Sequence, residues 1–300
     1  MMHVLLSVVI PCYNYAEVLP RAIASVLRQL SDDSELLVIN DGSSDHTDAV
    51  VQDLLVTYDK KFRYIKQSNV GLAATRNHGV KETSGRYVIF LDADDELLNG
   101  AITLFRQSLQ GQGEIGMLAA AHISRESDGR EKQHFVGELP ELPLLKLRAY
   151  LLDKTLSFSN GAVAINRQVL VKYPYPERFR SSEDVSVFSA ILANEKVVVV
   201  SDPVLRLHKH SDSLRHNILH AESVGMALVE QVFNPININA SLQVLKMPFS
   251  AQRALSLFRT FYLAGDMKKS RVYFSRAVML RPAVLFKFTY LRKYILSWFK

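Results

Sequence analysis

Cysteine is almost absent from this chain of 300 residues, which contains only Cys12. A single cysteine cannot form a disulfide within the chain, so a disulfide-stapled fold is excluded and a reducing compartment is favoured. No activating group adjoins Cys12 in the sequence. We therefore expect a small core side chain rather than a nucleophile at this position.

Long apolar runs are also missing, although 48% of the residues are hydrophobic. The N-terminal apolar run breaks at Pro11, which predicts that no signal peptide is present. Near the C-terminus, Lys287, Arg292 and Lys293 interrupt the apolar stretches, so no segment reaches the roughly 20 apolar residues that span a bilayer. We expect a cytoplasmic protein, either soluble or bound peripherally to the inner face of the membrane.

Acidic residues are scarce at the C-terminal end. Residues 251–300 contain eleven Lys or Arg but one acid, Asp266. The whole chain has a net charge of +6, so the last fifty residues carry +10 and the first 250 sum to −4. Because the basic excess is confined to one end, we do not expect a nucleic-acid-binding protein.

Apolar runs and helical patterns alternate along the first 100 residues. Strands are predicted in LLSVVI, which Pro11 ends, in ELLVIN, around residues 62–65 and in RYVIFL. Asn14 and Glu17 are spaced as a helix cap and its reciprocal partner. Apolar residues at helical spacing follow them at Leu19, Ile23, Val26 and Leu30. The pattern predicts an α/β fold, with a mixed, mainly parallel, Rossmann-like sheet and helices on both faces.

The second half of the chain has a more mixed pattern. Strand-like segments are IGMLAAAHI, GAVAIN and KVVVV, with a polar loop expected at 124–137 and a helix at 183–193. From about residue 221 the pattern is wholly helical, and residues 264–282 resemble half of a tetratricopeptide unit. A single copy cannot build a repeat array, so we predict a helical appendage.

Polar clusters follow three of the predicted strands, at Pro11–Asn14, Asn40–Ser44 and Asp92–Asp95. Ligands of open α/β sheets bind beyond the carboxyl ends of the strands, so these clusters indicate a nucleotide crevice. Taken alone, the Asp-Gly-Ser string after Asn40 is more typical of a turn with a helix cap.

The strongest chemical signal is the group of three carboxylates at Asp92, Asp94 and Asp95. On an extended backbone, Asp92 and Asp94 would project to the same side, where like charges repel unless a cation compensates them. Oxygen ligands suit Mg²⁺ or Mn²⁺, and phosphates of a substrate would complete the coordination. The alternative is a solvated cap on a helix that starts near Glu96.

Four strings together resemble the family 2 glycosyltransferases with a GT-A fold. They are SVVIPCYNYAEVLPRAIASVL, ELLVINDGSSDHT, QSNVGLAATRNHG and SGRYVIFLDADDEL, and they occur in the family order over about the first 100 residues. Further counterparts are Asn160-Gly161, Ser182-Glu183-Asp184 and Arg206-Leu207-His208 with Ser211 and Ser213. The resemblance therefore extends to about residue 216.

The resemblance implies a role for each matching residue. Five residues would bind the nucleotide-sugar. Pro11 and Tyr13 would lie against the base, and Asp41 would contact the base edge. Arg76 would lie near the base or the phosphates, and Asp92 near the ribose or a metal-bound water. Asp94 and His208 would bind the divalent metal, Mn²⁺ or Mg²⁺, and Asp184 would be the catalytic base.

Simpler interpretations stay open for some of these residues. Arg76 could be a surface charge, His208 a histidine at a strand end, and Glu183-Asp184 an acidic pair at a helix start. Asn40 and Leu205 depart from the family pattern, and no Gln-x-x-Arg-Trp string occurs, which disfavours processive polymerisation.

The predicted enzyme moves a sugar, with UDP-sugars the commonest donors of the family, to a glycan or lipid-linked acceptor with inversion, in polysaccharide biosynthesis. Residues 1–220 would form the catalytic domain, with a nucleotide-sugar-binding half at 1–100 and an acceptor half at 101–220. Residues 221–300 would form the basic helical region. The alternative is a catalytically silent nucleotide-sugar-binding or interaction protein.

The last eighteen residues predict an amphipathic helix that is both basic and aromatic. Its apolar positions are Val284, Leu285, Phe288, Leu291, Ile295 and Phe299. Such a helix can lie on an anionic membrane surface, or the same apolar stripe can pack on the rest of the protein.

Overall fold

The computed structural model describes residues 4–209 and 218–299. The chain divides into two compact units, the first comprising residues 1–139, 155–177 and 195–211, and the second comprising 140–154, 178–194 and 212–300. The predicted domain boundary at residue 220 stays a prediction, and Ser211 and Ser213 lie outside the described residues. Within the described parts of the chain, no helix combines the length and apolar character needed to cross a membrane.

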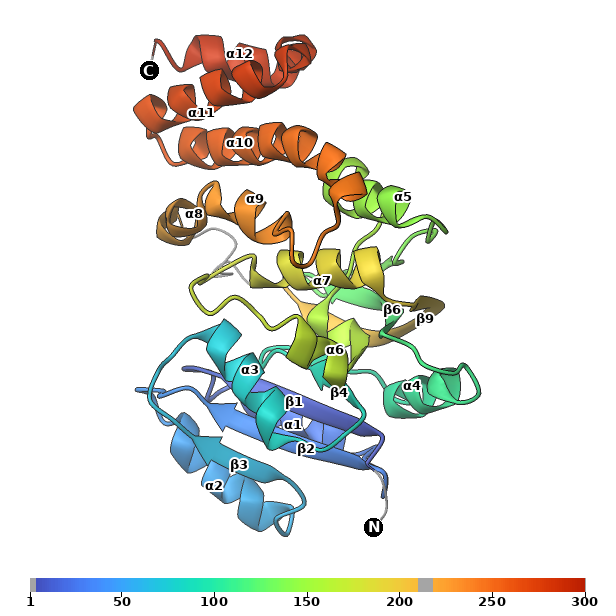
Figure 1. The fold of residues 1–300 in the computed structure, drawn as a ribbon. Coiled ribbons are helices and arrows are strands. Elements are labelled where there is room, and N and C mark those ends of the chain that lie inside the picture. The colour runs from blue at the N-terminus through green and yellow to red at the C-terminus, as the bar shows by residue number, and fades with distance from the viewer. Residues whose placement is uncertain (1–3, 210–217, 300) are drawn as a thin grey trace. The chain divides into compact units, whose positions relative to one another are not determined.

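One sheet forms the centre of the first unit (Figure 1). Its strands are β1 (Leu6–Cys12), β2 (Ser34–Asn40), β3 (Arg63–Lys66), β4 (Tyr87–Phe90), β5 (Glu96–Leu97), β6 (Met117–Arg125), β7 (Glu131–His134), β8 (Val163–Asn166) and β9 (Val197–His208). Across the described residues, the order is β3-β2-β1-β4-β8-β6-β9-β5, with β7 paired to β6. Strands β1 to β4 are parallel, while β8 and β5 pair antiparallel with their neighbours. The predicted mixed, mainly parallel sheet is confirmed.

Helices cover both faces of this sheet. They are α1 (Leu19–Leu27), α2 (Thr47–Thr57), α3 (Leu72–Glu82), α4 (Ala101–Leu109) and α6 (Arg167–Lys172). Val8 and Ile10 belong to a core cluster with buried residues of α1, α2 and α4. On the other face, a Cβ placed on Gly79 of α3 would lie 2.6 Å from Val9 Cγ1. Alternate residues of β1 therefore contact helices on opposite faces, as expected for a doubly wound sheet.

The second unit is helical. It contains α5 (Pro143–Arg148), a π-helical turn (Ala149–Asp153), α7 (Glu183–Asn194), α8 (Ile218–Val224), α9 (Ala227–Val232), α10 (Lys246–Leu263), α11 (Met267–Leu280) and α12 (Phe288–Leu296). Short 3₁₀ segments precede α10 at Ala240–Leu245 and α12 at Pro282–Phe286. Helix α11 packs on α10 through a cluster that includes Phe258 and Phe274. The predicted helical pattern after residue 221 is confirmed.

Strand β1 continues through Pro11 to Cys12, so the prediction that Pro11 ends the strand is wrong. Val9 accepts a hydrogen bond from Leu91 N on the β4 side, and Pro11, two residues on, faces the same side. The β1–β4 ladder ends at Val9 and Phe90. The missing N–H of Pro11 therefore falls beyond the ladder and costs no strand pairing.

The predicted cap at Asn14 and Glu17 is also wrong. Helix α1 begins at Leu19, and its N-cap makes no side-chain hydrogen bond. Asn14 instead has a φ of 60°, and its Oδ1 accepts hydrogen bonds from the backbone N–H groups of Ser44 and Asp45. Asn14 therefore joins two strand-end loops.

The expected polar loop at 124–137 contains a hairpin instead. Strand β7 pairs antiparallel with β6 from His122↔His134 to Arg125↔Glu131. The sequence of β7 is EKQH, whose polar residues are mostly exposed. Because such a strand has no apolar alternation, sequence periodicity could not reveal it.

Glu35 holds the start of β2 to the segment before β4. Its Oε1 accepts hydrogen bonds from Ser84 N at 2.7 Å, Gly85 N at 3.1 Å and Ser7 Oγ at 2.7 Å. Burial opposes the charged form, but these hydrogen bonds outweigh it and lower the pKa of Glu35 below its usual value.

We expect Glu35→Ala to lower the free energy of unfolding at pH 7 by about 1–3 kcal/mol, because the donors of the buried residues Ser7 and Gly85 lose this acceptor. A lowered pKa contributes stability above the unfolded value of 4.5 that is lost as the pH falls. The difference in the free energy of unfolding between Glu35→Ala and the parent should therefore be smaller in urea titrations at pH 3 than at pH 7. Glu114→Ala, at an exposed acid, is the control, and an equal loss there would contradict this role.

Candidate functional site

The three carboxylates after β4 lie on a turn. Asp95 N donates a hydrogen bond to Asp92 O at 3.0 Å, so the backbone is not extended as we predicted. Asp92 and Asp94 are nonetheless both half-buried, whereas Asp95 is buried. The segment that follows is β5, paired with β9, rather than a helix. The alternative interpretation as a helix cap near Glu96 is therefore wrong.

Burial and like charge act together on Asp95. Desolvation, followed by the negative charges of Asp92 and Asp94, raises the pKa of Asp95 to about 9. The same carboxylates act on Tyr15, where burial and then Asp94, Asp92 and Asp95 raise the pKa to about 12. The Tyr15 hydroxyl is therefore close to this group, which we name the carboxylate turn (Asp92, Asp94 and Asp95).

Arg76 is buried beneath the carboxylate turn, with 1% of its surface exposed. Its Nη2 donates to Asp92 Oδ1 at 2.9 Å. The guanidinium lies 5.3 Å from the ring centroid of Tyr175 and 5.9 Å from that of Phe90. Arg76 is thus not a surface charge; it is a buried cation, stabilised by two rings, that compensates one of the three carboxylates.

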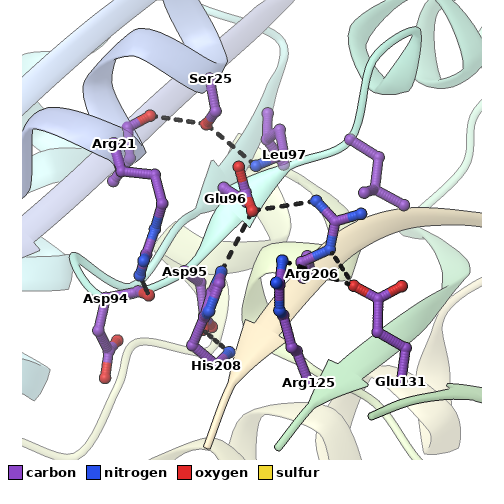
Figure 2. A network of polar contacts seen from close by, with 12 residues as sticks. Arg21, Ser25, Asp94, Asp95, Glu96, Leu97, Arg125, Glu131, Arg206 and His208 are labelled. Atoms are coloured by element: carbon purple, nitrogen blue, oxygen red, sulfur yellow. Dashed lines mark hydrogen bonds and ion pairs between the residues drawn. The ribbon is translucent and has the colours of Figure 1, made fainter. Parts of the chain in front are cut away.

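Glu96 joins the carboxylate turn to the Arg-x-His string. Its Oε1 accepts from Arg206 Nη1 at 3.0 Å and lies 3.2 Å from His208 Nε2 (Figure 2). These contacts outweigh burial and lower the pKa of Glu96. Residues two apart on β9 face the same side, which is why Arg206 and His208 reach one oxygen.

His208 also contacts the carboxylate turn through its backbone, because its N–H donates to Asp95 Oδ1 at 2.9 Å. Burial lowers the pKa of its imidazole despite the opposing effect of Glu96. A neutral imidazole is the form that binds metals, but the contact of Nε2 with Glu96 competes with coordination by that nitrogen. A metal-binding role for His208 stays a prediction.

Arg21 on α1 is a site residue that sequence reasoning missed. Its Nη2 donates to the backbone oxygen of Asp94, whose carboxylate points away from the Arg21 guanidinium (Figure 2). Arg21 also lines a cavity of about 370 Å³ with Glu96, Arg125, Glu126, Ser127, Gly129, His208 and Lys209. Only the packing of α1 beside β5 brings Arg21 to the carboxylate turn, so no local motif could have indicated it.

Asp41 organises the loop before α3. Its carboxylate accepts hydrogen bonds from Val70 N at 2.9 Å, Gly71 N at 2.8 Å and Gln67 Nε2 at 2.8 Å. Asn40 Oδ1 in turn accepts from Ser43 N at 2.9 Å. The structure therefore gives these residues turn-forming contacts, and a contact of Asp41 with a nucleotide base stays a prediction.

Three neighbouring residues of the β1 end differ in exposure. Pro11 is buried in the sheet, whereas the Tyr13 side chain is 46% exposed. Cys12 is buried in the main core, as predicted, and burial, then Asp45 and Asp41, raises its thiol pKa to about 12. Such a thiol is mostly protonated and is a poor nucleophile. Base contacts of Pro11 and Tyr13 stay predictions.

Asp184 belongs to the second unit. It lies with Glu183 in the first turn of α7, where an acidic pair interacts favourably with the helix dipole. Desolvation lowers the pKa of Lys154, and the negative charge of Asp184 partly offsets that effect. A cation therefore lies near Asp184, and its charge favours the ionised carboxylate.

The donor set of the carboxylate turn fits a hard divalent cation, because it presents oxygen atoms, and burial followed by the charges of Asp92 and Asp94 raises the pKa of Asp95. Across residues 4–209 and 218–299, however, no group of three or more His, Cys, Asp or Glu side chains is arranged to hold a metal. A metal here would need further ligands from a substrate, such as the oxygens of a diphosphate.

The family model described as "Glycosyl transferase family 2" matches residues 7–173, which are more than half of the chain. The chain belongs to glycosyl transferase family 2. The GalNAc(5)-diNAcBac-PP-undecaprenol beta-1,3-glucosyltransferase of Campylobacter jejuni is 39% identical over 136 residues, which cover 44% of this chain and 42% of that relative. The chain spans less than half the length of the curated relatives it matches.

Two solved structures share the fold of this family 2 chain. Staphylococcus aureus TarS 1-349 in complex with UDP-GlcNAc has a TM-score of 0.69 and 19% identity, covering 98% of this chain and 89% of TarS 1-349. The mannosyltransferase PcManGT of Pyrobaculum calidifontis, in complex with GDP-Man and Mn²⁺, has a TM-score of 0.54 and 14% identity, covering 97% and 86%. These likenesses confirm the predicted GT-A fold.

We expect Asp95→Asn to stabilise the protein at pH 8 in the presence of a chelator. The folded protein holds the Asp95 proton up to about pH 9, while the unfolded chain releases it near its ordinary value of 3.8. Stability therefore falls as the pH rises between these values, and the amide removes this cost. Each kcal/mol gained should raise the Tm by about 2–4 °C.

Thermal melts between pH 4 and pH 9 check this expectation, with Asp53→Asn at an exposed acid of α2 as the control. The same pH slope in parent and Asp95→Asn would show that Asp95 titrates normally.

Proposed function

We propose that this chain transfers a sugar from a nucleotide-sugar, a UDP-sugar above all, to a hydroxyl acceptor with inversion. The carboxylate turn with Arg76 beneath it, at the carboxyl end of β4 in a family 2 chain, is the observation that carries the proposal. The UDP-GlcNAc complex of TarS supports the choice of donor.

Asp94 and His208 would hold Mn²⁺ or Mg²⁺ together with the donor diphosphate, and Asp92 would contact the ribose or a metal-bound water. The Mn²⁺ in the PcManGT complex supports this part of the proposal. A cation bound there supplies charge that stabilises the departing nucleoside diphosphate. Arg76 holds Asp92 in place through the contact between Nη2 and Oδ1. Arg21 holds the backbone of Asp94 through its hydrogen bond to the Asp94 carbonyl oxygen.

Asp184 is the proposed catalytic base. It would accept the proton of the acceptor hydroxyl as the glycosidic bond forms on the side opposite the leaving group. The nearby charge of Lys154 and the N-terminus of α7 both favour the ionised carboxylate that this role requires.

The acceptor is proposed to be a glycan or a lipid-linked saccharide in cell-surface polysaccharide synthesis. The Campylobacter jejuni relative, whose name specifies an undecaprenol-linked substrate, supports a lipid-linked acceptor. A chain that uses such an acceptor works at a membrane surface, and we place it on the cytoplasmic side, where nucleotide-sugars would reach it. An anionic membrane surface is then a partner of the basic C-terminal helix.

We expect Asp94→Ala to lower transfer at least about a hundredfold, as loss of a principal electrostatic group does. Nucleoside diphosphate release from a panel of UDP-, dTDP- and GDP-sugars measures activity, and Mn²⁺ binding in the presence of UDP is followed by electron paramagnetic resonance. Mn²⁺ binding should weaken along with activity, whereas Asp53→Ala should change neither. Full activity of Asp94→Ala in a chelator would refute the metal assignment.

Asp184→Asn should lower the transfer rate about 10²–10⁴-fold, the usual contribution of a general base, while donor affinity stays within a factor of two. Calorimetry with UDP gives the affinity. Glu230→Gln, at an exposed acid of α9, is the matched control. Loss of donor binding with activity would assign Asp184 to the donor site instead.

A further inference from the structure

One face of the C-terminal segment is packed within the second unit. Val284, in the 3₁₀ segment before α12, is buried in the cluster of α10 and α11. Tyr294 of α12 stacks on Phe274 of α11, with ring centroids 4.3 Å apart, and Tyr290 and Leu291 contact the same cluster. Figure 1 shows α10, α11 and α12 lying next to one another. The tyrosine face of α12 is therefore partly buried against this cluster.

Other positions of this segment carry large apolar side chains in solvent. Phe286 is 78% exposed, Phe288 77% and Phe299 83%, and Ile295 is about half exposed. We name these four residues the aromatic edge. Three exposed phenylalanines within fourteen residues are more than isolated surface apolar residues normally provide, and such patches mark interaction sites.

The stretch of sequence that contains the aromatic edge carries charge of one sign. From Met267 to Lys300 the sequence contains nine Lys or Arg and neither Asp nor Glu. Lys287 separates Phe286 from Phe288, and Arg292 and Lys293 lie on α12 itself. A second copy of the same face would bring like charges together, whereas an anionic surface complements them. The positive charge therefore favours an anionic surface over a second copy of this chain as the partner.

We propose that the aromatic edge inserts into the headgroup region of an anionic lipid bilayer, with Lys287 and Arg292 at the phosphates. Phenylalanine side chains bury in the boundary between headgroups and acyl chains, and each cation near an anionic surface contributes roughly a fivefold factor in affinity. The tyrosine face stays packed on α11, so insertion requires no unfolding of α12. The purpose of docking rests on the proposed lipid-linked acceptor, but binding itself needs neither donor nor acceptor.

The test is sedimentation of the full chain with vesicles of 30% phosphatidylglycerol in phosphatidylcholine, against vesicles of phosphatidylcholine alone, at low salt. The parent should sediment with the anionic vesicles at low salt and should be released from them at high salt. Phe286→Ser with Phe288→Ser, and separately Lys287→Gln with Arg292→Gln, should each weaken binding at least tenfold. The residues of this segment that pack on α10 and α11 are unchanged in both variants. Melting temperatures equal to that of the parent would show that the variants are folded.

Matched controls come from the first unit. Phe135→Ser removes another exposed phenylalanine, and Lys60→Gln with Lys61→Gln removes two exposed cations, and both variants should bind vesicles like the parent. Absence of binding by the parent, or equal binding to neutral vesicles, would overturn the proposal. So would self-association in sedimentation velocity that the Phe286 and Phe288 changes abolish without any vesicle binding. Nucleoside diphosphate release is measured without vesicles, so failure of the transferase proposal would be seen separately.

Discussion

Repulsion among the carboxylates of the carboxylate turn is the constraint on which the rest of the first unit depends. Three acids within four residues, of which Asp95 is buried and the other two are half-buried, cannot all be ionised without compensation. The negative charge is reduced in two ways. Arg76 is buried against Asp92, and Asp95 keeps its proton up to about pH 9. The remaining negative charge is of the kind that a hard divalent cation compensates.

Compensation by Arg76 is possible only because other elements accept a buried guanidinium. Phe90 at the end of β4 and Tyr175 after α6 form an edge-to-face pair, with ring centroids 5.5 Å apart, on which Arg76 packs. Tyr175 is fixed in turn, because its hydroxyl donates to Asn160 Oδ1 at 2.9 Å. The family string Asn160-Gly161 therefore supports the carboxylate turn indirectly, through Tyr175 and Arg76. Gly161 lies close to β9, since a Cβ there would lie 2.7 Å from Leu205 Cδ1.

Much of the fold was predictable because apolar periodicity reports burial directly. The buried strands β1, β2, β4 and β6 were found, and so was α7. The errors arose where a long-range contact replaced a local one. Asn14 has the spacing of a helix cap, yet its side chain bonds to residues about thirty positions later. Strand β7 forms because its backbone pairs with β6, although its own residues show no apolar alternation that would predict a strand.

By itself, the sequence determined the α/β architecture, the strand ends at which the carboxylates gather, and a basic, apolar C-terminal segment. These features follow from the order of residue types, which fixes period and charge. Only the tertiary structure decided that Arg76 is buried, that Tyr15 and Arg21 lie at the carboxylate turn, and which face of α12 stays in solvent. Burial, and the charges that one group places on another, depend on distances between segments far apart in the chain, and those distances exist only once the elements have packed.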